Sequence, residues 1–515
     1  MQAISADELE RKLAPLTNAL LEAGWRAACE ASEINETAVV AAATALDGAL
    51  ASPERYRALC AADDGADRRI CLLRLAFESH QRAPDLARAI IAGEASLASR
   101  FSSHRGSIDG EPIDENAIDE ILRTSTDPER RRRAWEAAKS IGPLVDPELR
   151  ALVKLRNEAA RALGYRDHFA FSLAGEELDE GWLFGLLDRL ERELAPAWSR
   201  EKAAIDAAQA RRLGLDPGTA LRPWDYSDAF FQETPPLAHD ALGEALLTVD
   251  PVEAAAAYMR ALGEDVDHVI AASDLYPRER KNQHAFCIDL DRAGDVRVLA
   301  NCVPGLRWLG TMVHELGHAV YDLAIARSLP WTLRTYAHLL TTEAIAMLHG
   351  RRVRDAAFLT RFCGIDGSLA DAAVARRDLL IFVAWVQTMT RFERELYRDP
   401  DQDLGALWWS LVERHQRVAP PDGSRPHDWA CKIHLSTAPV YYHNYLLGEL
   451  TASQLEWALV RECGSSSPAA RPEVAGRFLR ERFAALGATM RWDALIEHAT
   501  GEPLDPRHLV GMLTA

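Results

Sequence analysis

The chain lacks long apolar runs, basic blocks and a dense set of cysteines. No stretch approaches 18 uncharged apolar residues, so no segment is expected to cross a bilayer. The 59 basic residues are outnumbered by 77 acidic ones, the net charge is -18, and no Lys/Arg-rich block occurs. This balance argues against nucleic acid as a partner and against binding to an anionic membrane surface.

The eight cysteines are scattered and show no C-x-x-C pairing. We expect them to be reduced, buried small side chains, with a Cys287–Cys302 disulfide as an alternative. Residues 1–8 lack the basic start and apolar run of a signal peptide. These features favour a cytoplasmic protein, which we expect to be a monomer or a weak oligomer.

Strand signals are also scarce, and most of the sequence has helical periodicity. We expect helices at about 5–32, 37–50, 68–101, 115–140, 146–163, 179–212, 240–262, 306–327, 341–361, 368–397, 402–418, 440–462 and 471–485. Strand signals are nearly confined to 283–301, where two strands, 284–290 and 296–299, flank a turn. Breaks rich in Gly, Pro and Ser are too short for interdomain linkers, so we expect one domain over 1–515.

The most informative motif is His-Glu-Leu-Gly-His at 314–318. Two histidines at i and i+4 of a helix lie on one face, roughly 5–6 Å apart at Cβ. His314 and His318 can therefore share one tetrahedral metal, with Glu315 beside its open position. Gly317 costs the helix about 1 kcal/mol relative to alanine, so we expect another segment to approach closely there.

A third ligand is expected from Glu343, in a second helix with Thr341 or Thr342 as its N-cap. Two histidines, one carboxylate and an open position are typical of catalytic zinc, whereas structural zinc sites close with four ligands. Zinc lowers the pKa of its water toward about 7, and Glu315 can take that proton and pass it to the leaving amine. The pattern predicts a zinc metallopeptidase with one Zn²⁺ per chain. A peptide-binding protein that has lost catalysis is the alternative of another class.

Further stretches of the chain extend the pattern beyond this motif. They are Glu22-Ala23-Gly24-Trp25, Asn157-Glu158-Ala159-Ala160-Arg161, Gly164-Tyr165, His284-Ala285, Asp289, Asp295-x-Arg297, Leu329-Pro330, Leu333-Arg334, Glu343-Ala344-Ile345, Lys432-Ile433-His434, Tyr442 and Tyr445. Together with the motif, this set resembles the angiotensin-converting enzyme family of peptidyl-dipeptidases, which are gluzincin metallopeptidases. It resembles the thimet-type oligopeptidases more loosely.

The resemblance implies a mainly α fold, a large helical ellipsoid of two halves around a deep substrate channel. A small β-hairpin would lie beside the zinc helix, with His284 and Ala285 on the strand that meets the substrate backbone. The implied activity is hydrolysis of short peptides with release of C-terminal dipeptides. An endo-acting oligopeptidase is the alternative within the same class.

The resemblance also implies roles for residues near the C-terminal end of the chain. Lys432, helped by Tyr442, would receive the C-terminal carboxylate of the substrate. His434 and Tyr445 would bind the developing oxyanion. Tyr441 competes with the other two tyrosines for these roles, but positions 442 and 445 share one helical face.

The sequence departs from the family pattern at several positions. Met347 stands where an acidic partner of a zinc histidine is expected, which leaves Asp322, at i+4 from His318, as a candidate. The glutamine that helps to bind the substrate carboxylate is not located. Asn444 replaces an arginine associated with chloride activation, so we do not expect chloride dependence.

Overall fold

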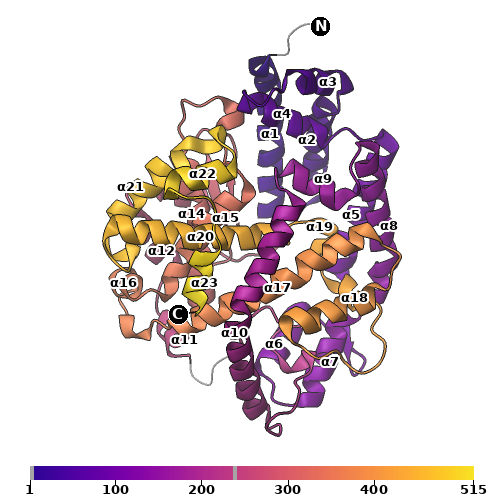
Figure 1. Cartoon of the computed structure of the whole chain (residues 1–515), viewed down its shortest axis with the longest axis vertical. Helices are drawn as coiled ribbons and strands as arrows, with labels where there is room; N and C mark the ends of the chain where they lie inside the picture. The colour runs from indigo at the N-terminus through magenta and orange to yellow at the C-terminus, as the bar shows by residue number, and fades with distance from the viewer. Residues whose placement is uncertain (1–4, 236–239, 515) are drawn as a thin grey trace. The chain divides into compact units, whose positions relative to one another are not determined.

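The computed structural model describes residues 5–235 and 240–514. The chain is mainly helical, as expected, and the sheets among the described residues are two antiparallel pairs of short strands (Figure 1). The chain divides into two compact units. Unit 1 comprises Met1–Gln81, Asp240–Ala372 and Leu447–Leu509, and unit 2 comprises Arg82–His239, Ala373–Leu446 and Val510–Ala515. The expected channel between two halves stays a prediction.

Unit 1 contains the expected hairpin and the helices around it. Its elements are α1 (Ala6–Cys29), α2 (Glu33–Leu50), α3 (Pro53–Ala62), α4 (Arg68–Glu78), α11 (Ala241–Leu246), α12 (Pro251–Ala261), α13 (Asp267–Ala272), β3 (Phe286–Asp289), β4 (Val296–Leu299), α14 (Leu306–Ala324), α15 (Leu339–Gly350), α16 (Ala356–Phe358), α21 (Pro472–Arg482) and α22 (Trp492–Thr500). Short 3-10 or π turns cover Trp331–Leu333, Arg351–Arg354, Leu359–Cys363, Gly367–Leu369, Pro468–Ala470 and Ala484–Thr489.

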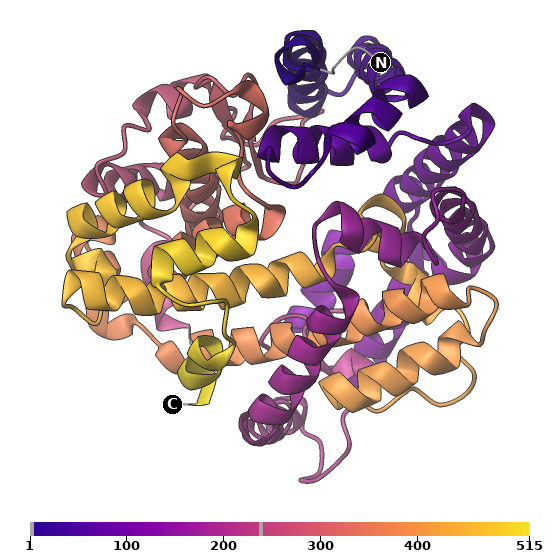
Figure 2. The ribbon, with the colours of Figure 1, turned by 45° about the horizontal axis from the view of Figure 1, so that its top comes forward.

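The N-terminal helices of unit 1 pack on one another around an apolar core. The Ser5 hydroxyl caps α1 by accepting the backbone N–H of Glu8 at 3.4 Å, as the sequence predicts. Helices α1 and α2 lie side by side (Figures 1 and 2). Leu9, Leu13 and Phe77 are among the buried residues of this core.

The hairpin β3–β4 packs on α14, the helix that carries the 314–318 motif. Its register pairs Phe286 with Leu299 and Asp289 with Val296. The second edge of β4 is partly covered, because Asp274 bridges to Leu299. Within the described part of the chain, β3 pairs with no strand besides β4.

Unit 2 is built from long helices and one small second hairpin. Its elements are α5 (Pro84–Ser103), β1 (Gly106–Ile108), β2 (Glu111–Ile113), α6 (Glu115–Thr124), α7 (Pro128–Lys139), α8 (Gly142–Ala162), α9 (His168–Gly175), α10 (Glu180–Leu213), α18 (Leu404–Leu411) and α19 (His434–Thr437). Short turns cover Pro223–Asp225, Val412–Gln416 and Asp428–Cys431. Helices α17 (Ala372–Arg398), α20 (Tyr442–Cys463) and α23 (Arg507–Thr514) include residues of both units.

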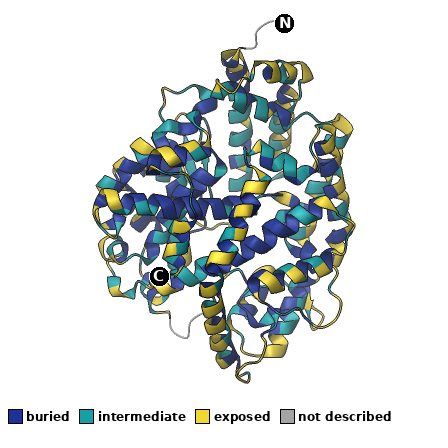
Figure 3. Ribbon diagram, viewed as in Figure 1, coloured by how far each residue is buried: buried dark blue, intermediate teal, exposed yellow. Residues whose placement is uncertain are grey.

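Aromatic side chains fill much of the interior of unit 2. The fully buried Trp135 of α7 has its ring centroid 5.7 Å from that of Trp224 and 6.3 Å from that of Trp409. The irregular segment that holds Trp224 thus serves the core, the commoner use of aromatic residues in a loop. Helix α17 is largely buried, whereas much of α10 is exposed (Figure 3).

Several helix boundaries differ from the sequence prediction. The single helix expected at 68–101 is two helices, α4 and α5, and the one expected at 115–140 is α6 and α7. Proline occupies the first turn of α5 and of α7, where its fixed φ starts a helix and its missing N–H costs nothing. Helices α3, α9 and α13 and the hairpin β1–β2 were not predicted, because each is too short for periodicity to reveal. No helix in the described ranges is long and apolar enough to cross a membrane.

Candidate active site

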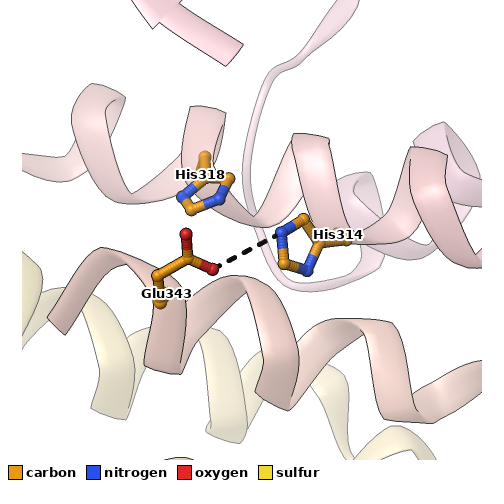
Figure 4. Close-up of side chains that lie close together, drawn as sticks. All are labelled: His314, His318 and Glu343. Carbon is orange, nitrogen blue, oxygen red and sulfur yellow. Dashed lines mark ion pairs between the residues drawn. The ribbon is translucent and has the colours of Figure 1, made fainter. Parts of the chain in front are cut away.

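The three predicted metal ligands come together in unit 1. His314 and His318 extend from α14 and Glu343 from α15 (Figure 4). Their ligand atoms all lie within 4.8 Å of one another, and His314 Nε2 is 3.8 Å from Glu343 Oε2. Ligand atoms around tetrahedral zinc with bonds of about 2.1 Å are roughly 3.4 Å apart, so small side-chain shifts suffice to close the site. The cluster can bind a metal ion.

Small residues let the two ligand-bearing helices approach closely. A Cβ atom on Gly317 of α14 would lie 2.8 Å from Ala346 Cα of α15. On another side of α15, a Cβ atom on Gly448 of α20 would lie 3.0 Å from Glu343 Cβ. The expected close approach at Gly317 is therefore confirmed. Glycine at both contacts holds α15 at the distance that the ligand set needs.

The electrostatics of the cluster suit a metal. Burial lowers the pKa of His314 to about 4 and that of His318 well below its usual range. Both rings are thus neutral at neutral pH, which is the form that binds zinc. Burial and the nearby charge of Glu343 raise the pKa of Glu315 to about 8, while the backbone N–H of Cys287 in β3 opposes that rise. Two neutral imidazoles and the buried carboxyl group of Glu343 form a donor set that fits zinc.

A hydroxyl group orients one of the two histidines. Thr342 Oγ1 lies 2.6 Å from His318 Nδ1, which leaves Nε2 of that ring for a metal. The prediction that Thr341 or Thr342 caps the helix was wrong. Helix α15 begins at Leu339, the His338 side chain is its N-cap, and Thr341 completes a capping box with His338.

Asp322, the sequence candidate for this orienting role, has a different environment. Burial, and then the charge of Asp289, raises the pKa of Asp322 to about 8, and Arg292 and Arg327 oppose the shift. The described partner of His318 Nδ1 is instead the Thr342 hydroxyl. The sequence analysis did not assign this role to Thr342 because it expected an acidic partner at position 347, five residues further along the same helix.

His284 and Ala285 precede the strand that they were expected to join. Strand β3 begins at Phe286, and the exposed His284 lies in a bend where its backbone N–H donates to Asn282 Oδ1 at 2.9 Å. Leu290 also lies outside the strand. All eight cysteines are free thiols, so Cys287 and Cys302 do not form the alternative disulfide.

Lys432 belongs to unit 2 and is enclosed by aromatic rings. Its Nζ lies 5.0 Å from the ring centroid of Phe230 and 5.3 Å from that of Trp385, and it donates to Gln232 Oε1 at 2.9 Å. Burial lowers the pKa of Lys432 to about 8, so the ammonium form prevails at neutral pH. Gln232 thus stands where a glutamine beside the lysine was expected. It lies about 200 positions earlier in an irregular segment, and no local motif marks it.

His434, Trp385 and Tyr445 pack around Tyr442 in unit 2. Ring centroids are 5.0 Å apart for His434 and Tyr442, 5.7 Å for Trp385 and Tyr442, and 5.8 Å for Tyr442 and Tyr445. Tyr442 is only 4 % exposed, whereas Tyr441 and Tyr445 are half-buried. Lys432, His434, Tyr442 and Tyr445 thus form one cluster, and their expected roles stay predictions. Trp385 lies within the helix expected at 368–397, and the sequence analysis gave it no role.

Asn444 is buried one residue before Tyr445. Its side-chain amide donates to Glu176 Oε2 at 3.1 Å, and His443 Nε2 lies 2.7 Å from the same oxygen. Position 444 thus holds a neutral amide that is hydrogen-bonded to the carboxylate of Glu176. The absence of chloride dependence stays a prediction.

The comparison with known families gives one result. The model of peptidase family M3 matches residues 121–246. The match supports a zinc-dependent metallopeptidase of the thimet-oligopeptidase type that acts on peptides. It does not include residues 314–343, so the zinc motif and the family match are separate indications of the same chemistry. No curated protein sequence matches the chain.

Proposed function

We propose that this protein is a zinc peptidyl-dipeptidase, which hydrolyses short peptides and releases dipeptides from their C-terminus. The observation that carries the proposal is the His314, His318 and Glu343 cluster, with the buried Glu315 beside it. Three ligands leave an open coordination position, which is typical of catalytic zinc. The match to peptidase family M3 supports peptides as the substrate class.

The proposed mechanism assigns proton transfer to Glu315. Bound zinc would polarise the scissile carbonyl and lower the pKa of a water to near 7. Glu315 accepts a proton from the attacking water and delivers it to the leaving nitrogen. The outer edge of β3 offers main-chain hydrogen bonds to an extended peptide. His434 and Tyr445 donate to the oxyanion as it forms.

The release of dipeptides depends on Lys432. A buried ammonium that donates to an amide oxygen, Gln232 Oε1, has further N–H groups for a substrate carboxylate. The Trp385 ring lies between Lys432 and Tyr442 and contacts both of them. Tyr442, which is 4 % exposed, would help to bind that carboxylate. A cation that binds the free C-terminus makes a peptidase exo-acting. An endo-acting oligopeptidase remains the alternative because family M3 matches the chain.

The decisive experiment removes the base and leaves the ligands. We expect Glu315→Ala to keep stoichiometric zinc, measured by metal analysis, and to lose about 10²–10⁴-fold in kcat. An exposed glutamate of unit 1, Glu481, supplies the control Glu481→Ala, which should match the wild type. Full activity of Glu315→Ala would refute the mechanism. Loss of zinc in that variant would make Glu315 a ligand.

A second experiment separates the two modes of cleavage. We expect amidation of the C-terminus of a tripeptide substrate to cut turnover sharply, because the amide offers Lys432 no negative charge. Equal turnover of the acid and the amide would make the protein an endo-acting oligopeptidase.

A further inference from the structure

Unit 2 contains a cavity of about 250 Å³ with Lys432 and Gln232 in its wall. Four carboxylates, those of Glu115, Asp119, Asp228 and Glu233, also line it. The volume suits one long side chain, since sites for whole drug-sized ligands are larger, at about 300–1,000 Å³.

Two of the four carboxylates are held by the protein itself. Asp228 accepts the backbone N–H groups of Phe230 and Gln232, each at 2.9 Å, and so fixes the loop that carries Gln232. Glu233 lies 4.0 Å from the guanidinium of Arg123. These two acids therefore have structural roles.

Glu115 and Asp119 have no such partners. Within the described residues, neither carboxylate makes a hydrogen bond or an ion pair, although both lie on α6 and line the cavity. Burial, and then the charges of Glu115, Asp228 and Glu233, raises the pKa of Asp119 to about 6, although the charge of Arg123 opposes the shift. An unpaired, half-buried carboxylate among like charges is stabilised by a cation.

The positively charged residue in the cavity wall, Lys432, also lacks an ion-pair partner in the described part of the chain. Lys432 forms no ion pair with any described residue, and its hydrogen bond is to a neutral amide. The charges of Asp228, Glu115 and Asp119 nevertheless reach its ammonium group and oppose the effect of burial on its pKa. One cavity thus contains a cation with no described anion in ion-pair contact and two carboxylates with no described cation in ion-pair contact. This pattern complements a ligand that bears both charges.

We infer that this cavity binds the C-terminal residue of the substrate when that residue is basic, an arginine or a lysine. The α-carboxylate binds Lys432 and Gln232, and the cationic side chain binds Asp119 and Glu115. The inference rests on the proposed function, since it takes the C-terminus of a peptide as the ligand. It adds a preference for basic C-terminal residues. Lys432 alone would not provide that preference, because every C-terminal residue has the same α-carboxylate.

Arginine and citrulline make a matched pair of probes, because citrulline has nearly the shape of arginine without its charge. We would measure kcat/KM for N-acylated tripeptides that end in Ala-Arg or Ala-citrulline, with the zinc-loaded full chain. Binding of the free dipeptides Ala-Arg and Ala-citrulline would be measured by calorimetry. One charge-assisted hydrogen bond corresponds to a preference for the arginine form of about tenfold or more in both measurements.

The variant Asp119→Asn with Glu115→Gln should bring both ratios close to one. Glu120→Gln removes one charge from an exposed position of the same helix that does not line the cavity, and it should keep the wild-type ratios. Equal binding and turnover of the two forms by the wild type would overturn the inference and leave the proposed function standing.

An unchanged preference in the double variant would also overturn the inference. If the wild type hydrolyses neither tripeptide, the proposed function fails. Dipeptide binding then still decides the inference, because it does not depend on turnover.

Discussion

The proposed reaction uses residues from two regions that are built differently. In unit 1 the proposed zinc ligands lie within two helices, α14 and α15, which pack through Gly317 and Ala346. In unit 2 the proposed substrate-binding residues come from an irregular segment, a short turn and three helices, and Phe230, Trp385 and Tyr442 hold them together. Metal ligands need fixed separations, which packed helices provide. Recognition of a flexible peptide end tolerates loops, where binding residues are common.

The largest effect is expected from removing a ligand from the rigid region. Glu343→Ala should weaken zinc binding by more than about 100-fold, because loss of a direct ligand costs more than loss of a residue behind one. Peptidase activity should fall with the zinc content. Competition with a chelator measures the affinity. Wild-type affinity in this variant would show that the histidines bind the metal without α15.

The next largest effect tests recognition in unit 2. Lys432→Met should raise KM by about 10–100-fold for a peptide with a free C-terminus, since a hydrogen bond to a charged group is lost. The same change should hardly affect the amidated peptide. Lys154, an exposed lysine of the same unit, gives the control Lys154→Met. Equal losses for both peptides would assign Lys432 a structural role.

Two adjacent threonines separate ligand orientation from helix stability. Thr342→Val removes the hydroxyl beside His318 Nδ1 and should weaken zinc binding by about 10–100-fold. Thr341→Val removes the capping contact with His338 and should lower the free energy of unfolding by about 0.5–2 kcal/mol. Chelator competition and chemical denaturation of both variants measure the two effects. Identical profiles would contradict the separate roles.

An effect of similar size tests the rigidity of the α14–α15 pair. Gly317→Ala should destabilise the protein by about 1–3 kcal/mol, because the added methyl group meets the backbone of Ala346. Gly310→Ala in the same helix is the control. Its Cβ meets only Val353 Cγ2, at 3.9 Å, so the higher helix propensity of alanine should stabilise the protein by about 0.5–1 kcal/mol. Urea unfolding of both variants would show the opposite signs. A stabilising Gly317→Ala would mean that the helices can move apart at no cost.

The two units also differ in how well the sequence predicts which of their residues come together. His314 and His318 lie four residues apart, so the spacing alone places both rings on one helix face. Gln232 and Lys432 are 200 positions apart, and Asp119 and Glu115 are more distant still from the lysine that shares their cavity. No periodicity connects such residues. The hydrogen-bond partner of His318 was the least predictable feature. Positions 322, 342 and 347 are all compatible by spacing with a side chain near the ligands, and only the structure shows that Thr342 makes the contact.

Sequence alone predicted the helical class, the hairpin before the motif, the three candidate ligands and the proposed base, because each prediction depends on local periodicity or fixed spacing. The tertiary structure decided which hydroxyl orients His318, where β3 begins and which glutamine joins Lys432. It also decided that two unpaired carboxylates share a cavity with that lysine. These features arise from packing between segments that are distant along the chain. No local sequence pattern indicates such contacts.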